Sequence, residues 1–335
     1  MSPRASLPPV LVLGSGPIAA VAAIVMARRR EVVLSLGTAN SRSAPRIDSL
    51  PIHMLGLLVE LGIHPAQLQL EDRHDTILST WEDALPKAIT AFPKVHVHRQ
   101  LLDKALLRLT EGISRITLTE HASVDRYECV IDATGRRAMT ATSVRRAEPC
   151  WVARTRTLRG RYSLAQAALR IAPAPQGYAY RLASRGVLTL GFVSPAPFSR
   201  LGEDAFAEGL RRAGGGWILS QLPSFEEMEP GRGGECSVQW TVASGGPRPV
   251  GDASFAPDAL AAQGLALGLS EAMRLAGDHT TRDDARPRAH VTRLRTVIAR
   301  CRCRDEAAWR AYDTLLGSWE NEPMSTEASR LTLTI

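Results

Sequence analysis

Two glycines near the start of the chain are spaced to bind a phosphate group. Residues 10–13 form a short apolar run that leads into Gly14 and Gly16, and an alanine-rich apolar stretch begins at Pro17. A strand that turns into a helix through such glycines brings backbone N–H groups and the positive helix end close to a dinucleotide pyrophosphate. Ala19 stands where many such turns have a third glycine, and the pattern tolerates alanine there. An ordinary tight turn is the alternative.

A second set of small and acidic residues follows far downstream. Gly251 and Asp252 come after a short apolar stretch, and Asp258 precedes Gln263 and Gly264 at the start of another alanine-rich run. An Asp at a strand end can accept hydrogen bonds from a sugar hydroxyl, and a helix that begins near Gly264 turns its positive end toward an electron-rich ring. The two sets, in this order, predict a site that closes around one flavin.

Further polar residues lie at predicted strand ends. Asp132 closes an apolar strand and leads into a turn of small residues, which suits the close approach of a ligand. The second predicted strand, residues 31–36, lacks at its end the Asp or Glu that binds the adenosine ribose in nucleotide-binding folds. Ser35, with Thr38 and Asn40, can hydrogen-bond the ribose more weakly than a carboxylate would.

Composition excludes several classes of protein. The 335 residues can bury a sizeable core, and 44% hydrophobic with 22% charged residues is an ordinary globular balance. The longest apolar run, residues 17–27, is too short to span a bilayer, and no cleavable leader precedes it. The five scattered cysteines fit a reducing compartment and lack the spacing of a zinc site. We therefore expect a cytoplasmic protein with no membrane partner.

The formal net charge of +7 comes largely from arginine. Nucleic-acid binding favours aromatic side chains for stacking, and these are only 5% of the residues, so we expect no nucleic-acid partner. A basic surface could instead dock an acidic protein. His96 and His98 alternate on a predicted strand and face one side, but no third ligand accompanies them, and the sequence predicts no metal ion.

Apolar periodicity predicts an α/β fold. Strands are expected at residues 7–13, 31–36, 116–119 and 129–132, and helices at 17–29, 51–61, 100–109, 206–214, 260–275 and 293–316. Residues 151–240 are rich in strand-like segments with one helix and predict an antiparallel sheet that faces the substrate. The expected domains are an FAD-binding domain from residues 1–150 and 241–280, this β-rich layer, and a helical segment at 281–335.

The order of these motifs resembles the FAD-dependent monooxygenases of the group that includes the flavin-dependent tryptophan halogenases. Within that group the chain looks most similar to the halogenase-like hydroxylases that mature protein-derived quinone cofactors. The most specific match is Gly251-Asp252 with residues 258–264, which resemble the family's Gly-Asp-Ala-Ala and Asp-Pro-Leu-Ser-Ser-Gln-Gly, with Ala259 in place of proline. The likeness covers most of residues 9–275 and includes shorter stretches: residues 46–51 with Asp48 for a family Glu, Leu61-Gly62-Ile63 followed by Trp81, Arg99 with Asp103 and Leu106, residues 132–136, and residues 177–180.

The resemblance implies both a fold and a chemistry. It implies a Rossmann-like FAD-binding domain of the p-hydroxybenzoate hydroxylase type, with an inserted antiparallel β-sheet that faces the substrate and C-terminal helices. Reduced flavin and O₂ would form a C4a-hydroperoxide that hydroxylates an electron-rich aromatic ring, and a peptidyl tryptophan or tyrosine is one candidate substrate. The candidate FAD contacts are Gly14, Gly16, Ala19, Ser35, Arg46, Arg99, Asp132, Gly251, Asp252, Asp258, Gln263 and Gly264.

Two histidines lie in segments that the family places near the active site. His53 and His74 are the candidate catalytic residues, which would hydrogen-bond the substrate or the peroxide. The alternative for both is an ordinary surface or core position.

Departures from the family pattern leave other functions open. The halogenase Trp-x-Trp-x-Ile-Pro motif is absent, and Arg73 or His74 lies near the position of the halogenase lysine, so we do not expect halogenation. The missing strand-two acid, Ala259 and the short chain favour a non-catalytic flavin-binding maturation partner as the first alternative. The second is an NAD(P)-dependent oxidoreductase, to which Arg42 and Arg46 could offer a phosphate site. No second glycine motif for NAD(P)H appears, so the expected source of electrons is either a partner flavin reductase or transient contact with NAD(P)H.

Overall fold

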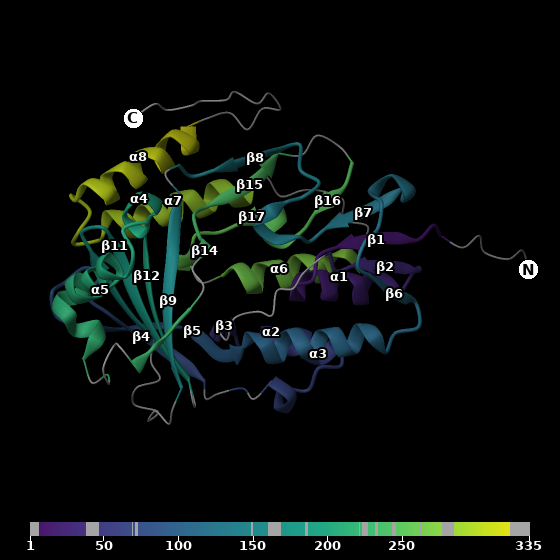
Figure 1. Ribbon diagram of the computed structural model, residues 1–335, viewed down its shortest axis with the longest axis horizontal. Helices are drawn as coiled ribbons and strands as arrows, with labels where there is room; N and C mark the ends of the chain where they lie inside the picture. The colour runs from purple at the N-terminus through teal and green to yellow at the C-terminus, as the bar shows by residue number, and fades with distance from the viewer. Residues whose placement is uncertain are drawn as a thin grey trace, which may run out of the picture.

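The computed structural model of the chain describes residues 7–37, 47–68, 70, 73–148, 150–159, 169–184, 187–220, 222, 227–231, 234–242, 246–261, 263–276 and 285–321. In this part of the chain the strands form three sheets, which helices cover in layers (Figure 1). No helix among the described residues is both long and apolar enough to cross a bilayer.

A parallel sheet carries the predicted nucleotide-binding turn. Its order is β16-β7-β1-β2-β6, and its described pairs are all parallel. Its strands are β1 (Val10–Leu13), β2 (Val32–Ser35), β6 (Ile116–Thr119), β7 (Cys129–Asp132) and β16 (Arg248–Pro249). β1 is buried along its whole length, because Val10 and Val12 pack under the first helix and Leu11 and Leu13 pack beneath residues 122–127. A strand covered on both faces is apolar at every position, as this one is.

Three helices lie close together on one face of this sheet. They are α1 (Pro17–Ala27), α3 (Arg99–Glu111) and α6 (Gly264–Met273). α1 is buried on almost every side, because it lies between the sheet, α3 and α6. This position explains why its sequence is apolar all round rather than amphipathic.

The largest sheet is mixed and runs β13-β9-β12-β11-β10-β4-β5-β3, with β14 paired to β9. Its strands are β3 (Ile47–Pro51), β4 (His74–Ser79), β5 (Lys87–His98), β9 (Trp151–Arg159), β10 (Leu169–Ala174), β11 (Gly177–Ser184), β12 (Val187–Pro195), β13 (Glu229–Pro230) and β14 (Gly234–Glu235). Its described pairs are antiparallel except β4 with β10, which is parallel. The antiparallel sheet predicted for residues 151–240 is present, and the pairing of β10 with β4 extends it by three strands from residues 47–98.

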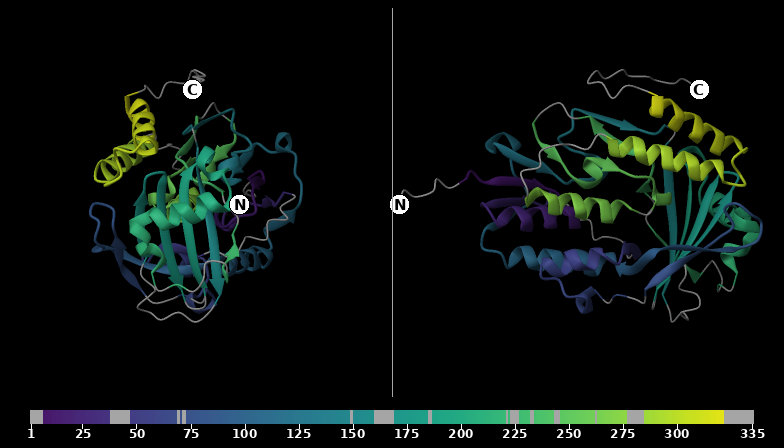
Figure 2. Two further views of the ribbon diagram at one scale, coloured as in Figure 1. Left: turned by 60° about the vertical axis from the view of Figure 1, so that its left-hand side comes forward. Right: turned by 180° about the vertical axis from the view of Figure 1, so that it is seen from behind.

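A small antiparallel sheet and the C-terminal helices complete the architecture (Figure 2). The sheet is β17-β15-β8, and its members and the two helices are β8 (Ser143–Arg146), β15 (Gln239–Val242), β17 (Phe255–Ala256), α7 (Ala285–Ala299) and α8 (Ala307–Asn321). Between these elements and the large sheet lies a buried group of rings, the aromatic cluster of Trp81, Trp151, Tyr178, Trp309 and Tyr312. Ring centroids are 4.7 Å apart for Trp151 and Tyr312 and 5.4 Å apart for Trp81 and Trp309.

The remaining helices are short. They are α2 (Met54–Glu60), α4 (Ala196–Ser199) and α5 (Glu203–Arg212), with the 3₁₀ turns η1 (Pro65–Leu68), η2 (Val124–Arg126), η3 (Gly135–Arg137), η5 (Ala213–Leu219), η7 (Gly251–Ala253), η8 (Ala259–Ala261) and η9 (Arg274–Ala276). Phe206 and Leu210 of α5 pack against Phe192 and cover the face of the large sheet that is turned away from the aromatic cluster.

Three helix predictions need correction. The helix predicted for residues 51–61 is the shorter α2, because Pro51 pairs with Lys94 and ends β3. The helix predicted for residues 260–275 begins only at Gly264, after η8. The helix predicted for residues 293–316 is two helices, because the chain leaves α7 after Ala299 and the N–H of Arg302 donates to the carbonyl oxygen of Trp81 at 2.8 Å.

Candidate functional site

The first glycine motif forms the turn between β1 and α1, at the carboxyl ends of neighbouring parallel strands. Gly14 has φ +129°, and its N–H donates to the carbonyl oxygen of Ser35 at 2.9 Å. Gly16 is the last residue before α1, and the N–H of Ala20 makes the first helical hydrogen bond back to it. The N–H groups before Ala20 therefore have no acceptor within the helix. This edge of a parallel sheet is where α/β folds bind their ligands.

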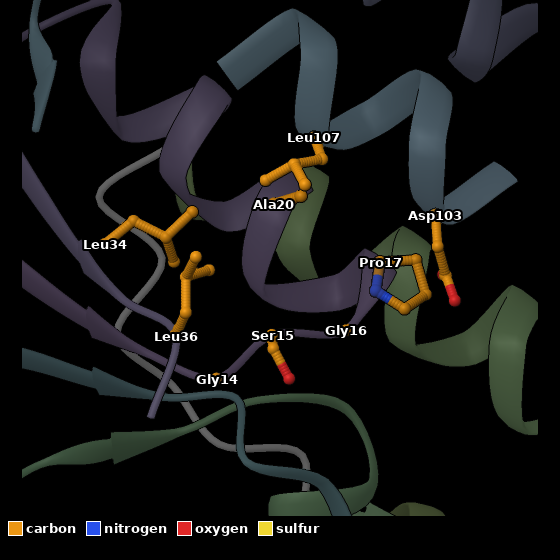
Figure 3. Close-up of a pocket in the computed structure, with 9 residues that line it drawn as sticks. All are labelled: Gly14, Ser15, Gly16, Pro17, Ala20, Leu34, Leu36, Asp103 and Leu107. Carbon is orange, nitrogen blue, oxygen red and sulfur yellow. The ribbon is translucent and has the colours of Figure 1, made fainter. Parts of the chain in front are cut away.

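A small pocket lies at this turn and opens to solvent. Figure 3 shows side chains of β2 and α3 facing the glycine turn across the pocket. The lining residues are Gly14, Ser15, Gly16, Pro17, Ala20, Leu34, Leu36, Asp103 and Leu107. The leucines form an apolar wall, whereas Ser15 and Asp103 supply polar groups. A mostly apolar lining with a few polar groups is typical of small-molecule sites.

Ser35, a predicted cofactor contact, is not among the residues that line this pocket. Side chains alternate along a strand, so Leu34 and Leu36 face the pocket and Ser35 faces away from it. The hydroxyl of Ser35 donates to the carbonyl oxygen of Glu120 at 3.4 Å instead. Arg46, with its neighbours Thr38, Asn40 and Arg42, lies outside the described residues.

Arg99 lies beside the glycine turn, at the start of α3. Its Nε donates to Asp103 Oδ1 at 2.7 Å and its Nη1 to Asp48 Oδ2 at 3.2 Å. A Cβ added to Gly16 would lie 3.7 Å from Arg99 Nη2, so the guanidinium is next to the turn. Burial opposes its charge, but the carboxylates of Asp48 and Asp103 outweigh burial and raise the pKa of Arg99. The Arg99 guanidinium therefore stays charged beside the turn, together with the two carboxylates that pair with it.

The second glycine motif packs directly against the first helix. Gly251 has φ +65°, and a Cβ added there would lie 3.0 Å from Ile18 of α1. A Cβ added to Gly268 of α6 would lie 2.7 Å from the same isoleucine. The two motifs, far apart in the sequence, are therefore side by side, as Figure 1 shows for α1 and α6.

The start of α6 holds three of the predicted contacts together. Gln263 precedes the helix and Gly264 is its first residue. The carboxylate of Asp252 lies beside them, since a Cβ added to Gly264 would be 3.4 Å from Asp252 Oδ1. The N–H groups of this helix start can stabilise negative charge on a ligand ring.

We expect Gly268→Ala to loosen the contact between α1 and α6. The new Cβ would lie 2.7 Å from Ile18 Cδ1 and 3.3 Å from Gly251 Cα, so Ile18 must shift. The free energy of unfolding, measured by urea denaturation, is expected to fall by about 1–2 kcal/mol although alanine favours helices. Gly56→Ala in α2 is the matched control, because nothing lies within 4 Å of its added Cβ, and it is expected to stabilise. Equal effects of the two substitutions would contradict this close packing.

Asp132 accepts hydrogen bonds from the loop that follows β7. Its buried Oδ1 accepts hydrogen bonds from the N–H and hydroxyl of Thr134 at 2.9 and 2.6 Å. Oδ2 accepts from the N–H and hydroxyl of Thr140, both at 2.8 Å. In this structure, therefore, both oxygens of Asp132, a predicted cofactor contact, accept their hydrogen bonds from the protein itself. The spacing of Asp132 and Thr134 is that of an Asx turn, which could have indicated this role.

Asp258 lies against the C-terminal helix α8 and is not among the residues that line the pocket. Its carboxylate is 2% exposed and accepts the hydroxyl of Tyr312 at 2.6 Å and the N–H of Leu260 at 2.7 Å. Burial raises the pKa of Asp258, although these hydrogen bonds and the charge of Arg136 act to lower it. The structure thus gives Asp258 an anchoring contact where the prediction gave it an FAD contact.

Neither predicted catalytic histidine is among the residues that line the pocket. His53 is exposed at the start of α2. His74 begins β4 opposite Lys94, and its side chain lies outside the described residues. Over the described ranges, no group of three or more His, Cys, Asp and Glu side chains is arranged to hold a metal ion.

One charged residue of the pocket, and a buried cluster outside it, were missing from the predicted set. Asp103 lines the pocket from α3, and its pairing with Arg99 follows their spacing of one helical turn, which is the available sequence signal. The aromatic cluster joins rings from β9, β11, α8 and the loop after β4, and no local pattern links such distant segments.

Comparison with known proteins finds similarity in structure but not in sequence. No family model matches the chain, and no curated protein matches it. The chain is similar to QhpG, a peptidyl tryptophan dihydroxylase essential for tryptophylquinone cofactor biogenesis, with TM-score 0.68, 17% identity, and 92% of this chain and 79% of QhpG covered. It is similar to the myxobacterial chondrochloren halogenase CndH, a variant of the FAD-dependent halogenases, with TM-score 0.69, 17% identity, and 92% and 86% covered. It is also similar to a tryptophan halogenase from Shewanella frigidimarina, with TM-score 0.71, 11% identity, and 94% and 83% covered.

These matches confirm the predicted fold class. The parallel Rossmann-like sheet, the antiparallel sheets and the C-terminal helices occur together in this chain as in those proteins. The chain has the α/β fold of the flavin-dependent halogenases.

Proposed function

We propose that this chain binds FAD, with the adenosine diphosphate part of the cofactor in the pocket at the β1–α1 turn. The observation that carries the proposal is the arrangement around Gly16. Free backbone N–H groups at the start of α1, the Arg99 guanidinium and the leucine wall converge there. The helix start and the guanidinium suit a pyrophosphate, and the apolar wall suits an adenine ring.

Residues of the second motif would hold the rest of the cofactor. Asp252 would accept a hydrogen bond from a hydroxyl of the cofactor, and Gln263 and Gly264 would present the start of α6 to the flavin ring. Asp103 lines the pocket and supplies a carboxylate for the ribose, which the second strand lacks. Because α1 and α6 pack together, one cofactor can reach both motifs.

We further propose that the reaction is monooxygenation of an electron-rich aromatic substrate. Bound FAD, once reduced, supplies the electrons and activates O₂. The chain contributes positioning and a dry environment, to which the buried aromatic cluster beside the second motif is suited. Similarity in fold to QhpG, which is named as a peptidyl tryptophan dihydroxylase, supports a peptidyl tryptophan or tyrosine substrate, and a separate flavin reductase is the proposed electron source.

FAD binding is tested by titration of the purified chain with FAD, followed in the visible spectrum. We expect Gly16→Ala to weaken binding at least about tenfold, because the added methyl group fills the space that a pyrophosphate needs. Gly112→Ala is the matched control, because its added Cβ would meet neighbouring backbone only at 3.6 Å and lies away from the pocket. Absence of FAD binding by the wild-type chain would overturn the proposal, and nicotinamide binding in its place would favour the NAD(P)-dependent alternative.

The monooxygenase step has a separate test. Substrate-dependent O₂ consumption by the FAD-loaded chain, with reduced FAD supplied by a flavin reductase, is expected with an aromatic peptide. Tight FAD binding without such consumption, across both peptides and free aromatics, would instead favour the non-catalytic maturation partner.

A further inference from the structure

Two cysteines at the connection between α7 and α8 lie outside the proposed cofactor site. Cys301 and Cys303 are separated by a single residue and lie in a turn. A hydrogen bond from the N–H of Arg304 to the carbonyl oxygen of Cys301, at 3.0 Å, closes this turn. Each thiol shifts the pKa of the other, as expected of neighbouring side chains. Cys301 is 1% exposed, whereas Cys303 is half-buried. Cys303 is therefore the more accessible residue of the pair.

The charges around this pair favour an ionised Cys303. Arg300, Arg302 and Arg304 alternate with the two cysteines, and all three arginines are exposed. The interaction with Cys301 and the charge of Arg302 lower the pKa of Cys303, against burial and Glu306, which act to raise it. The interaction with Cys303 and burial raise the pKa of Cys301. Of the two thiols, Cys303 is therefore the one that loses its proton more readily and is the better nucleophile.

We propose that Cys301 and Cys303 form a redox-active dithiol site whose oxidant is hydrogen peroxide or a small organic hydroperoxide. The Cys303 thiolate attacks one peroxide oxygen, the O–O bond breaks, and hydroxide leaves as Cys303 becomes a sulfenic acid. Cys301 then attacks that sulfur and displaces its hydroxyl group, while the proton of Cys301 goes to the leaving oxygen. In sum, two thiols and one hydrogen peroxide give one disulfide and two water molecules. A tight turn brings such neighbours within the Cα separation of about 4.4–6.8 Å that disulfides span.

The dithiol is connected to the aromatic cluster by hydrogen bonds and by packing. The N–H of Arg302 donates to the carbonyl oxygen of Trp81 at 2.8 Å, and Trp81 Nε1 donates to the carbonyl oxygen of Val297 at 2.8 Å. The side chain of Cys301 belongs to the same core as Trp309. Drawing the Cys301 sulfur toward Cys303 changes the packing around these rings. Oxidation is therefore expected to change the tryptophan fluorescence of the protein.

The test uses the reduced full chain without FAD, so its outcome is independent of the proposed function. After treatment with one equivalent of hydrogen peroxide at neutral pH, peptide mapping by mass spectrometry is expected to show a Cys301–Cys303 disulfide that dithiothreitol reverses. In Cys301→Ala, a sulfenic acid that dimedone traps is expected to persist at Cys303. In Cys303→Ala, Cys301 is expected to stay reduced. Cys129→Ala, which removes a half-buried cysteine of β7, is the matched control and is expected to leave the disulfide unchanged.

Alkylation of the unmodified chain tests the same site without any substitution. With iodoacetamide, Cys303 is expected to react faster than Cys129 at neutral pH, and Cys150, whose pKa burial raises, is expected to react slowly. The proposal is wrong if Cys303 reacts no faster than Cys129 between about pH 6 and pH 9. It is equally wrong if peroxide leaves both thiols reduced, or links Cys303 to a cysteine other than Cys301.

Discussion

Gly14→Ala is expected to lower the free energy of unfolding by about 3–5 kcal/mol and to abolish FAD binding. Gly14 has φ +129°, and an added Cβ would lie 2.4 Å from the carbonyl oxygen of Ala133. That oxygen is backbone at the end of β7, so it cannot rotate away. Relief would require β1 and β7 to separate, although both lie in the buried centre of the parallel sheet. Urea denaturation measures the first effect, and titration with FAD measures the second.

Gly16→Ala, at the same turn, is expected to weaken FAD binding with little effect on stability. The added Cβ would meet only Arg99 Nη2, at the ordinary contact distance of 3.7 Å. Its free energy of unfolding is therefore expected to stay within about 0.5 kcal/mol of the wild-type value while FAD affinity falls. Wild-type stability in Gly14→Ala would mean that the turn is not held against β7 as the structure has it.

Stability is expected to fall as the pH drops from about 6.5 to about 4, with His290 responsible for up to about 3 kcal/mol of the fall. His290 is 4% exposed, and burial, with the charges of Arg293 and Arg286, lowers its pKa from 6.5 to about 4. Its Nε2 accepts the backbone N–H of Asp258 at 3.3 Å, which a protonated ring cannot do. Below pH 6.5 His290 becomes protonated in the unfolded chain, whereas in the folded chain it becomes protonated only near pH 4. This contribution to stability is thus complete above pH 6.5 and is lost as the pH falls through that window.

His290→Gln is the control for this pH dependence. Glutamine offers an oxygen to the N–H of Asp258 but does not titrate, so its stability is expected to lack the part of the slope that His290 causes. Asp258 and Glu271 act in the opposite direction, because burial raises their pKa values and each favours the folded state as the pH falls. The difference between the two proteins in urea denaturation, rather than either slope alone, therefore measures His290. Parallel curves would contradict a buried, neutral His290.

Those parts of the fold that depend on short-range patterns could be predicted from the sequence. β6 and β7 occupy the predicted residues 116–119 and 129–132, because β6 alternates apolar residues with threonine and β7 is a short apolar run. The β1–α1 turn could be identified because its glycines permit a backbone turn and a close approach that other residues would obstruct. β3 and β4 had no comparable local pattern, and their pairing with β5 and β10 decides their structure.

The candidate site was predicted less well at the level of single side chains. Ser35 was predicted as a contact because of its hydroxyl group. Side chains alternate along the strand, however, so the leucines on either side of Ser35 line the pocket and Ser35 points away from it. Asp258 belongs to the most specific motif, yet its carboxylate meets Tyr312, which is 54 residues further along the chain. Motif likeness therefore indicated which segments approach one another, whereas the direction of each side chain depended on partners that no local pattern reveals.

The strand order of the two larger sheets bears on how the chain folds as it leaves the ribosome. In the described chain, strands β3, β4 and β5 of the large sheet are synthesised before β6 and β7 of the parallel sheet. The last strand of the parallel sheet, β16, is synthesised only after β14, the last strand of the large sheet. β4 must wait for β10, and until then it presents an open edge that can pair with other chains. Closing such long loops costs entropy before the new contacts form, so we expect this protein to fold slowly. The nascent N-terminal part up to β10 is therefore the portion of this protein that most needs protection by a chaperone.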